Sequence, residues 1–470
     1  MWKLLTAIAL VTATSLCDAA PGTNIVDVHI RSLSELSVKA LRQRTYQTSY
    51  ELLQNVTPPE ETGFSLMLGY VSDGLNLYMR LDLPSRAPPE SGFPVLVFAP
   101  GWIPREDSPE WDFGLTPGSF SHRTIEDFKR NGFAVITAGY RGRGTVNGVQ
   151  AQGIEFRDAW GNGSYLSPIF YSIDLLNLIS GVALLDQLEW QKFLQDTAPR
   201  PKFDLQRISL LGHSQGGDVA LNTLAVLGNN PGYPHKLVGA SIWSGNIPDR
   251  FTQANTFGPM GSTLQAFMSG DGSWTGSAVG GDGTVNPDFV FPWPADWIGT
   301  LDTHSSEWSW QAETWATPTV ADALQRKYSE MYATLNRYVD DMDNLKFTLF
   351  QDEHGSTRIG HSAPVAELIP KIGGFNYHKY VKTPLLLHIS DRDYYSIPAW
   401  NTDLAARINA DGGFAQVYTY AGNTHSLQAS KHRWFSPAGT VDGAPMAVQR
   451  DTNLFLGNKL PASNQALERR

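Results

Sequence analysis

The chain has 470 residues, of which 41% are hydrophobic and 17% are charged, so it can bury a large core and general disorder is excluded. Its 36 basic and 46 acidic residues give a formal net charge of -10, which argues against binding to the phosphate backbone of nucleic acid. The chain is longer than an average domain, and we expect one large domain that carries an insertion.

The first residues have the pattern of a secretory signal peptide. One cationic residue precedes an apolar stretch from Leu4 to Leu16, and the small residues Ala19 and Ala20 follow. We expect residues 1–19 to be removed and the mature protein to be secreted, or periplasmic if the source is bacterial. A single-pass anchor is the alternative, but the apolar run is shorter than the ~20 residues that span a bilayer, so no stable membrane anchor is expected.

After this segment the pattern changes twice. Weak amphipathic spacing over residues 34–47 predicts a helical strap that packs on the main domain. Two strand-like segments, residues 64–68 and 75–79, then flank Ser72-Asp73-Gly74, which is typical of a turn between antiparallel strands. These strands are expected to form the entry to a sheet.

Short apolar runs then alternate with helical patterns. Continuous rather than alternating hydrophobicity is typical of strands that are buried on both faces, so the order predicts an α/β fold with a mostly parallel, doubly wound sheet. The expected strands are residues 95–99, 133–138, 208–211, 238–243, 385–389 and 417–420. The expected helices are residues 119–130, 171–194, 215–227 and 400–409.

The alternation stops after Ser244 and resumes with the strand at residues 385–389. We interpret the intervening part, which includes a helix expected at residues 321–345, as a lid over the carboxyl ends of the strands; a separate domain is the alternative. Its tryptophans, such as Trp308 and Trp310, would either close an apolar substrate site or form the lid's own core. The expected division is a signal peptide (1–19), a strap (20–63), a catalytic domain (64–245 and 376–460) and an insertion (246–375).

A strand-to-helix turn carries the strongest chemical signal. Gly212-His213-Ser214-Gln215-Gly216 fits the G-x-S-x-G pattern between an expected strand and an expected helix, which is the context of a nucleophile elbow. Glycines on both sides allow a serine to sit at a sharp turn. Ser214 is therefore the predicted nucleophile, and the N–H of Gln215 at the helix start is a predicted oxyanion donor. An ordinary turn is the alternative.

A serine hydroxyl needs an imidazole base and a carboxylate that orients the imidazole. This fold places the acid and then the histidine after the serine in the chain. His425 follows the last expected strand and is the only one of the eleven histidines with this placement, so it is the predicted base. Asp391 and Asp393 both follow the strand before it. We prefer Asp393, since Asp391 could instead pair with Arg392 or cap the loop, but the choice between them stays open.

A second oxyanion donor is expected from the loop after residues 95–99, which reads Pro100-Gly101-Trp102. We predict the N–H of Trp102, with a tight turn alone as the alternative.

The other histidines fit structural roles better than catalysis. His213 is expected to pack beside the nucleophile and His388 to lie in the core. His354 and His361 do not have metal-ligand spacing to a third group, so no metal and no other cofactor are expected.

Three motifs together resemble the catalytic domain of the prolyl-oligopeptidase-like serine hydrolases (peptidase family S9) of the α/β-hydrolase superfamily. They are Tyr70-Val71-Ser72-Asp73-Gly74-Leu75, Tyr140-Arg141-Gly142-Arg143-Gly144 and Gly212-His213-Ser214-Gln215-Gly216-Gly217. The resemblance covers about residues 64–245 and 380–430. It implies acyl transfer through a serine ester, with a peptide, an amino-acid amide or a carboxylic ester as substrate.

Three departures limit what the resemblance implies. The residues before the expected domain are too few for the β-propeller of size-selective members. The family's oxyanion tyrosine is absent from Phe98-Ala99-Pro100-Gly101, and its common His-Gly has become Pro100-Gly101. We therefore rank a secreted peptidase just ahead of a carboxylesterase. A catalytically silent fold used for binding is disfavoured by the ordered Ser, Asp and His, and a metal-dependent hydrolase ranks third. A small-molecule or peptide substrate is the expected partner, and the oligomeric state stays open.

Overall fold

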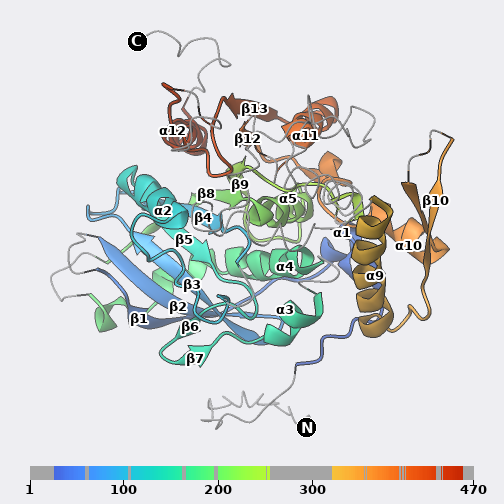
Figure 1. Ribbon diagram of the computed structural model, residues 1–470. Coiled ribbons are helices and arrows are strands. Elements are labelled where there is room, and N and C mark those ends of the chain that lie inside the picture. Colours follow the sequence, from blue (N-terminus) through green and yellow to red (C-terminus); the bar gives the residue numbers. More distant parts are fainter. Residues whose placement is uncertain are drawn as a thin grey trace, which may run out of the picture.

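A computed structural model describes most of the chain between residues 26 and 458 (Figure 1). The described residues are 26–58, 63–103, 107–160, 166–194, 200–249, 251–253, 320–353, 355, 357–390, 393, 396, 398–429, 436 and 438–458. The expected signal peptide and residues 254–319 of the expected insertion lie outside them.

A nine-stranded sheet forms the centre of the fold. Its strands are β1 (Tyr50–Asn55), β2 (Phe64–Ser72), β3 (Leu75–Leu83), β4 (Phe93–Ala99), β5 (Ala134–Ala138), β8 (Phe203–His213), β9 (Leu237–Trp243), β12 (Leu385–Ser390) and β13 (Ala415–Tyr420). Their order is β1-β2-β3-β5-β4-β8-β9-β12-β13. The pairs from β1 to β5 are antiparallel, and every pair from β5 to β13 is parallel. The expected mostly parallel α/β sheet is confirmed.

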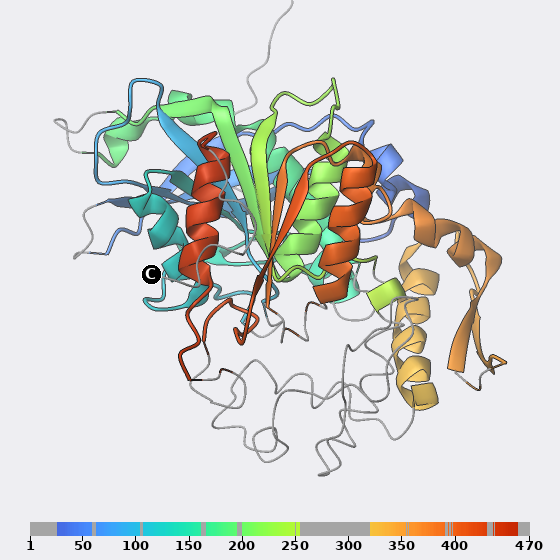
Figure 2. The same cartoon turned by 90° about the horizontal axis from the view of Figure 1, so that it is seen from above.

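Helices cover both faces of this sheet. The α-helices are α1 (Val38–Leu41), α2 (Phe120–Arg130), α3 (Ile154–Trp160), α4 (Ser167–Ser180), α5 (Gln215–Leu227), α9 (Val320–Tyr338), α10 (Ala363–Leu368), α11 (Pro398–Ala410) and α12 (Ala444–Phe455). The 3-10 turns are η1 (Leu33–Leu36), η2 (Val182–Gln187), η3 (Trp190–Lys192), η4 (Ile369–Lys371) and η5 (His378–Tyr380). Figure 2 shows α12 on one face of the sheet and α5 and α11 on the other. The buried side chains divide in the same way, since α2 and α12 share one hydrophobic cluster and α4, α5 and α11 belong to the larger one.

Two small hairpins lie outside the sheet. They are β6 (Thr145–Val146) with β7 (Val149–Gln150), and β10 (Phe347–Gln351) with β11 (Thr357–His361). Figure 1 places α9 and β10 together at the periphery, on the side opposite α2.

The turn between β2 and β3 follows from its sequence. Asp73 and Gly74 both have positive φ, at 50° and 79°. A two-residue hairpin turn with positive φ at both positions matches the twist of antiparallel strands and favours an Asp-Gly pair. The expected turn is confirmed.

The first strap residues differ from the expected helix over 34–47. The structure has only η1 and α1 there, because the hydroxyls of Ser32 and Ser37 each accept a hydrogen bond from a backbone N–H and start a new short turn. Arg42 then donates through Nη1 to the carbonyls of Ala225, Val226 and Gly228 at the end of α5, and so ties this segment to the main domain. The chain continues as β1, an edge strand that the sequence did not predict.

The helix expected over 171–194 is shorter and earlier in the structure. It is α4, and Gly181 follows it. A Cβ on Gly181 would lie 2.3 Å from Thr48 and 3.0 Å from the ring of Tyr50, so the strap passes directly over this position. The close approach requires glycine, and glycine favours the end of a helix.

The helix expected over 321–345 also ends early, at Tyr338. Its carbonyl accepts from the N–H of Ile30 (2.9 Å), and the N–H of Asp340 donates to the carbonyl of Ile30 (2.9 Å). These bonds form a parallel bridge between Ile30 and Val339, and a turn follows at Asp340 and Asp341. A lid over the strand ends stays a prediction, because residues 254–319 and the tryptophans among them lie outside the described residues.

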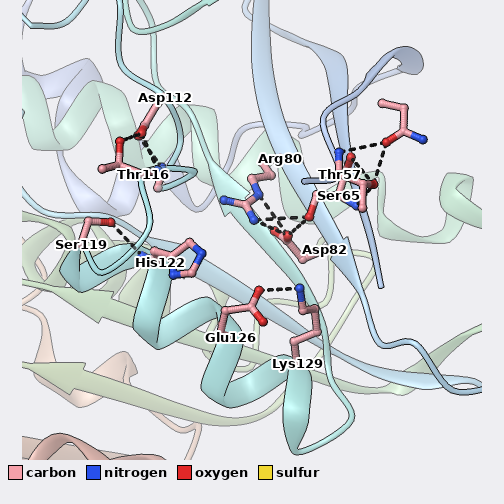
Figure 3. A network of polar contacts seen from close by, with 12 residues as sticks. Thr57, Ser65, Arg80, Asp82, Asp112, Thr116, Ser119, His122, Glu126 and Lys129 are labelled. Carbon is pink, nitrogen blue, oxygen red and sulfur yellow. Dashed lines mark hydrogen bonds and ion pairs between the residues drawn. The ribbon is translucent and has the colours of Figure 1, made fainter. Parts of the chain in front are cut away.

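Figure 3 shows polar contacts within the antiparallel part of the sheet and within the neighbouring helix α2. Asp82 and Arg80 are fully buried, and one carboxylate oxygen of Asp82 accepts from Arg80 Nη2 (2.6 Å) and Ser65 Oγ (2.6 Å). On α2, Lys129 forms an ion pair with Glu126. The Asp82 group links β2 to β3, whereas the Glu126–Lys129 pair lies within α2.

Among the residues that the structure describes, no helix combines the length and the apolarity that crossing a membrane requires.

Candidate active site

The sheet topology has a switch point between β4 and β8. The chain leaves β4 for β5 on one side, and it leaves β8 for β9 on the other. Ligands of open α/β sheets bind outside the carboxyl ends of the strands at such a switch point. The residues at these two ends are Pro100-Gly101-Trp102 after β4 and Ser214 after β8. Both segments were predicted to be functional.

Ser214 sits on a strained turn. Its φ is 54° and its ψ is -122°, a conformation that residues with a Cβ rarely adopt. A Cβ on Gly212 would lie 2.3 Å from the carbonyl oxygen of Gly216, and a Cβ on Gly216 would lie 2.1 Å from that of Ala99. Both glycines of the motif are therefore required, as expected for a nucleophile elbow. The side chain of Ser214 is half-buried.

The end of β9 supports this turn from behind. The N–H of Ser214 donates to the carbonyl of Trp243 (3.0 Å), and the N–H of Asn246 donates to the carbonyl of Ser214 (3.2 Å). A Cβ on Gly217 would lie 2.7 Å from the Cα of Gly245. The second glycine after Gln215 thus has a packing reason that the sequence did not reveal.

The structure brings Asp393 and His425 together. His425 Nδ1 lies 2.9 Å from each carboxylate oxygen of Asp393, and the Asp393 side chain is fully buried. The N–H of Ser396 also donates to Asp393 Oδ1 (3.0 Å), which helps to hold the carboxylate. Asp391 lies outside the described residues. The contact therefore supports the preference for Asp393 without testing Asp391.

His213 joins the loop that carries His425 to the turn at Ser214. Its Nε2 donates to the carbonyl of His425 (3.3 Å), and its ring packs on Phe120 at a centroid distance of 4.1 Å and on His425 at 5.0 Å. Burial lowers the pKa of His213 well below its ordinary value, and the neighbouring imidazole of His425 lowers it further. This packing role agrees with the expectation for His213.

The two predicted oxyanion donors lie on the segments that follow β4 and β8. Gln215 is the first residue of α5, where backbone N–H groups have no partner within the helix and carry the positive end of its dipole. A Cβ on Gly101 would lie 3.2 Å from the Cβ of Ser214, so the loop that carries Trp102 passes close to the serine. The Trp102 side chain is itself exposed.

His388 is buried in β12, as expected, but it belongs to a polar network. Its Nε2 donates to Asp451 Oδ1 (2.9 Å), and its Nδ1 accepts from the hydroxyl of Tyr420 (2.7 Å). The indole N–H of Trp243 donates to the other oxygen of Asp451 (2.8 Å). The network connects α12 to the end of β9, which in turn holds the Ser214 turn. No sequence pattern pointed to Asp451.

Arg143 is a second residue to which no sequence pattern gave a role. It is the second arginine of the Tyr-Arg-Gly-Arg-Gly segment and is only 4% exposed. The structure places it against the loop after β4. Within the described part of the chain, no group of three or more His, Cys, Asp or Glu side chains is placed to hold a metal ion.

No protein-family model matches the sequence, and no curated protein matches it. Solved structures that it resembles include acetyl xylan esterase 1 from Thermoanaerobacterium sp., at 14% identity over 91% of this chain and 96% of that chain with a TM-score of 0.44. An acetyl xylan esterase from Paenibacillus sp. R4 is 16% identical over 83% and 86%, with a TM-score of 0.39. An acylaminoacyl peptidase from Pyrococcus horikoshii is 14% identical over 88% of this chain and 41% of that chain, with a TM-score of 0.38.

The fold is decided by the geometry of the sheet and of the Ser214 turn, not by these similarities. The order of the sheet and the strained strand–turn–helix at Ser214 match the α/β-hydrolase architecture. The chain therefore has the α/β-hydrolase fold.

Proposed function

We propose that the protein is a serine hydrolase that cleaves peptide, amide or ester bonds through an acyl-enzyme on Ser214. The observation that carries this proposal is the pairing of His425 Nδ1 with the carboxylate of Asp393, at the sheet edge that also holds the strained Ser214 turn. A nucleophile on a strained turn, a histidine and a buried carboxylate are the parts that acyl transfer needs.

Each group has one role in the proposed reaction. A proton on Nδ1 of His425 is held by Asp393, and Nε2 is then the nitrogen that takes the proton of the Ser214 hydroxyl. The serine oxygen attacks the carbonyl carbon, and the N–H groups of Gln215 and Trp102 stabilise the oxyanion. His425 then protonates the leaving group, and a water molecule releases the acyl group by the same steps in reverse.

Peptide and amide bonds are the first substrate class in this proposal, because the motifs resemble family S9. Carboxylic esters are the second candidate. The observation that favours esters is the loop Pro100-Gly101-Trp102, which lacks the family's oxyanion tyrosine. Resonance stabilises an ester carbonyl less than an amide carbonyl, so attack on an ester needs less stabilisation of the tetrahedral intermediate.

We propose further that the protein acts outside the cell, or in the periplasm of a bacterium, after removal of residues 1–19. The charged, apolar and small-residue pattern of this segment supports the proposal. Sequencing of the amino terminus of the protein collected from the culture medium tests it. A membrane-attached protein that keeps Met1 would contradict it.

Hydrolysis by the purified protein and its Ser214→Ala variant tests the reaction. The panel compares nitrophenyl esters of increasing acyl length with aminoacyl and prolyl anilides, and Ser329→Ala, at an exposed position of α9, is the matched control. Anilide cleavage that is lost in Ser214→Ala and kept in Ser329→Ala supports the peptidase. Cleavage of esters without cleavage of anilides moves the assignment to carboxylesterase. Activity that survives in Ser214→Ala overturns the mechanism. If Ser214 does not react with a fluorophosphonate, the protein is instead a catalytically silent member of the fold that serves in binding.

A further inference from the structure

The loop after β4 needs an anchor, because it leaves the sheet beside the nucleophile and carries the proposed second oxyanion donor. Arg143 supplies contacts on both sides of this loop. Its Nη1 donates to the carbonyl of Ile103 (2.8 Å) and to the hydroxyl of Ser108 (2.8 Å). Arg143 is 4% exposed and Ser108 is fully buried, so water competes little for these bonds. Ile103 is the neighbour of Trp102, which makes the contact local to the donor.

The arginine is itself held in place by α4. Its Nη2 donates to the hydroxyl of Tyr171 (3.2 Å), and its guanidinium lies 5.3 Å from the centre of the Tyr171 ring. The Tyr171 ring stacks on Tyr140 at 4.5 Å with an interplanar angle of 8°. The hydroxyl of Tyr140 donates to the carbonyl of Pro100 (3.4 Å), at the start of the same loop. The loop is thus held at Pro100 and at Ile103 by one buried stack.

The backbone of the Tyr140–Gly144 segment adds a third connection. The N–H of Gly144 donates to the carbonyl of Ser108 (2.7 Å). Gly144 has a positive φ of 89°, and a Cβ there would lie 2.5 Å from the ring of Phe113. The segment and the loop after β4 therefore pack against each other without room for a larger residue.

We propose that Arg143 is a positioning residue that holds the loop after β4 so that the N–H of Trp102 faces the oxyanion. This inference rests on the proposed function. An oxyanion donor acts only when it reaches the developing charge at hydrogen-bond distance, and a small displacement loses most of its effect. Because the charge develops after the substrate is bound, loss of the anchor lowers kcat and leaves KM nearly unchanged.

The test compares Arg143→Met and Arg143→Lys with Arg42→Met. Arg42 is a matched control, since its guanidinium also donates to backbone carbonyls but at the far end of α5. For each variant, kcat and KM are measured on the best substrate of the panel, together with the inhibition constant of a boronic acid that forms a tetrahedral adduct with Ser214. Thermal unfolding reports the loss of stability separately.

We expect Arg143→Met to lower kcat by about 100-fold and to raise the boronic acid's inhibition constant by a similar factor, with KM nearly unchanged. Arg143→Lys keeps the charge but lacks the second nitrogen that donates to Tyr171, and it is expected to lose about 10-fold. Arg42→Met should lower the melting temperature only. If Arg143→Met does not fold, the kcat and the inhibition constant of Arg143→Lys test the inference instead.

A parental kcat and inhibition constant in the Arg143 variants would overturn the inference, even if their melting temperature falls. The proposed function fails by a different result, namely activity that persists in Ser214→Ala. The two failures are therefore distinguishable in one set of measurements.

Discussion

His425 presents Nδ1 to both carboxylate oxygens of Asp393, at 2.9 Å each. The two residues lie on loops that follow different strands, β12 and β13, which are parallel neighbours in the sheet. Because their carboxyl ends meet at one edge, residues far apart in the chain become partners across a short gap. The carboxylate of Asp393 fixes which nitrogen of the imidazole carries the proton, so a substitution of Asp393 is expected to have a large effect.

Replacement of Asp393 by asparagine should remove most of the activity. The amide would offer its own N–H to Nδ1 and favour the wrong tautomer, so we expect kcat to fall by about 10³–10⁴ with KM little changed. Steady-state kinetics on the best substrate measure the effect. Asp391→Asn is the control and should keep most of the parental kcat. The opposite pattern, with Asp391→Asn inactive and Asp393→Asn active, would assign the acid to Asp391.

Gly216→Ala should damage both the elbow and the stability of the protein. The new Cβ would lie 2.1 Å from the carbonyl oxygen of Ala99 and 2.4 Å from that of Pro100, so β4 and its loop must move away from the elbow. We expect a loss of about 1–3 kcal/mol in the free energy of unfolding, together with a lower kcat. Urea unfolding and kinetics measure the two effects. Gly232→Ala, whose Cβ would meet only Asn230 at 3.6 Å, should cost nothing, and equal behaviour of the two variants would refute the packing argument.

Asp174→Ala should strongly destabilise the fold. Asp174 is fully buried on α4 and accepts from Arg141 Nη2 (2.6 Å) and Ser72 Oγ (2.7 Å). Its loss leaves a buried guanidinium without its main partner, at a cost of about 3–5 kcal/mol. The exposed pair of Asp403 and Arg407 on α11 provides the comparison, and Asp403→Ala should cost about 0.5 kcal/mol. Chemical denaturation that finds similar losses in both variants would count against the argument from burial.

His213 should make the protein less stable in mild acid. Burial, and then the neighbouring imidazole of His425, keep the pKa of His213 well below the 6.5 of the unfolded chain. Below that pH the unfolded state binds a proton that the folded state does not, so the free energy of unfolding falls as the pH falls, by up to about 1.4 kcal/mol per pH unit. His213→Phe, which keeps a ring beside Phe120, removes this term.

Urea unfolding of the parent and of His213→Phe at about pH 7 and about pH 5 measures the difference. The variant is expected to lose less stability between the two conditions than the parent. Equal losses would mean that His213 titrates alike in both states, which would contradict its burial.

Much of the fold followed from local patterns. The apolar runs predicted six strands of the central sheet, namely β4, β5, β8, β9, β12 and β13, and α5 has the bounds that its sequence indicates. Ser119 caps α2 by accepting from the N–H of His122, so the expected helix start is also explained by local chemistry. These elements depend on residues close in sequence, such as buried runs, caps and turn residues.

The missed elements depend on distant partners. The expected long helix after Tyr171 is replaced by a shorter α4 because the strap crosses Gly181, and α9 stops where Ile30 pairs with its end. The edge strand β1 exists because the Tyr50–Asn55 segment pairs with β2, although its own hydrophobic pattern is weak. No local pattern contains these contacts.

The candidate site divides in the same way. The sequence by itself determined the strand-to-helix turn around Ser214, and it placed the proposed acid and the proposed base on the loops after β12 and β13, because these features follow from residue spacing within single strand-to-loop segments. Only the tertiary structure placed Asp393 on His425 and the Arg143 guanidinium on Ile103, since these contacts join segments that meet only when the sheet is assembled. The physical reason is that a hydrogen bond depends on distance in space, whereas a sequence pattern records distance along the chain.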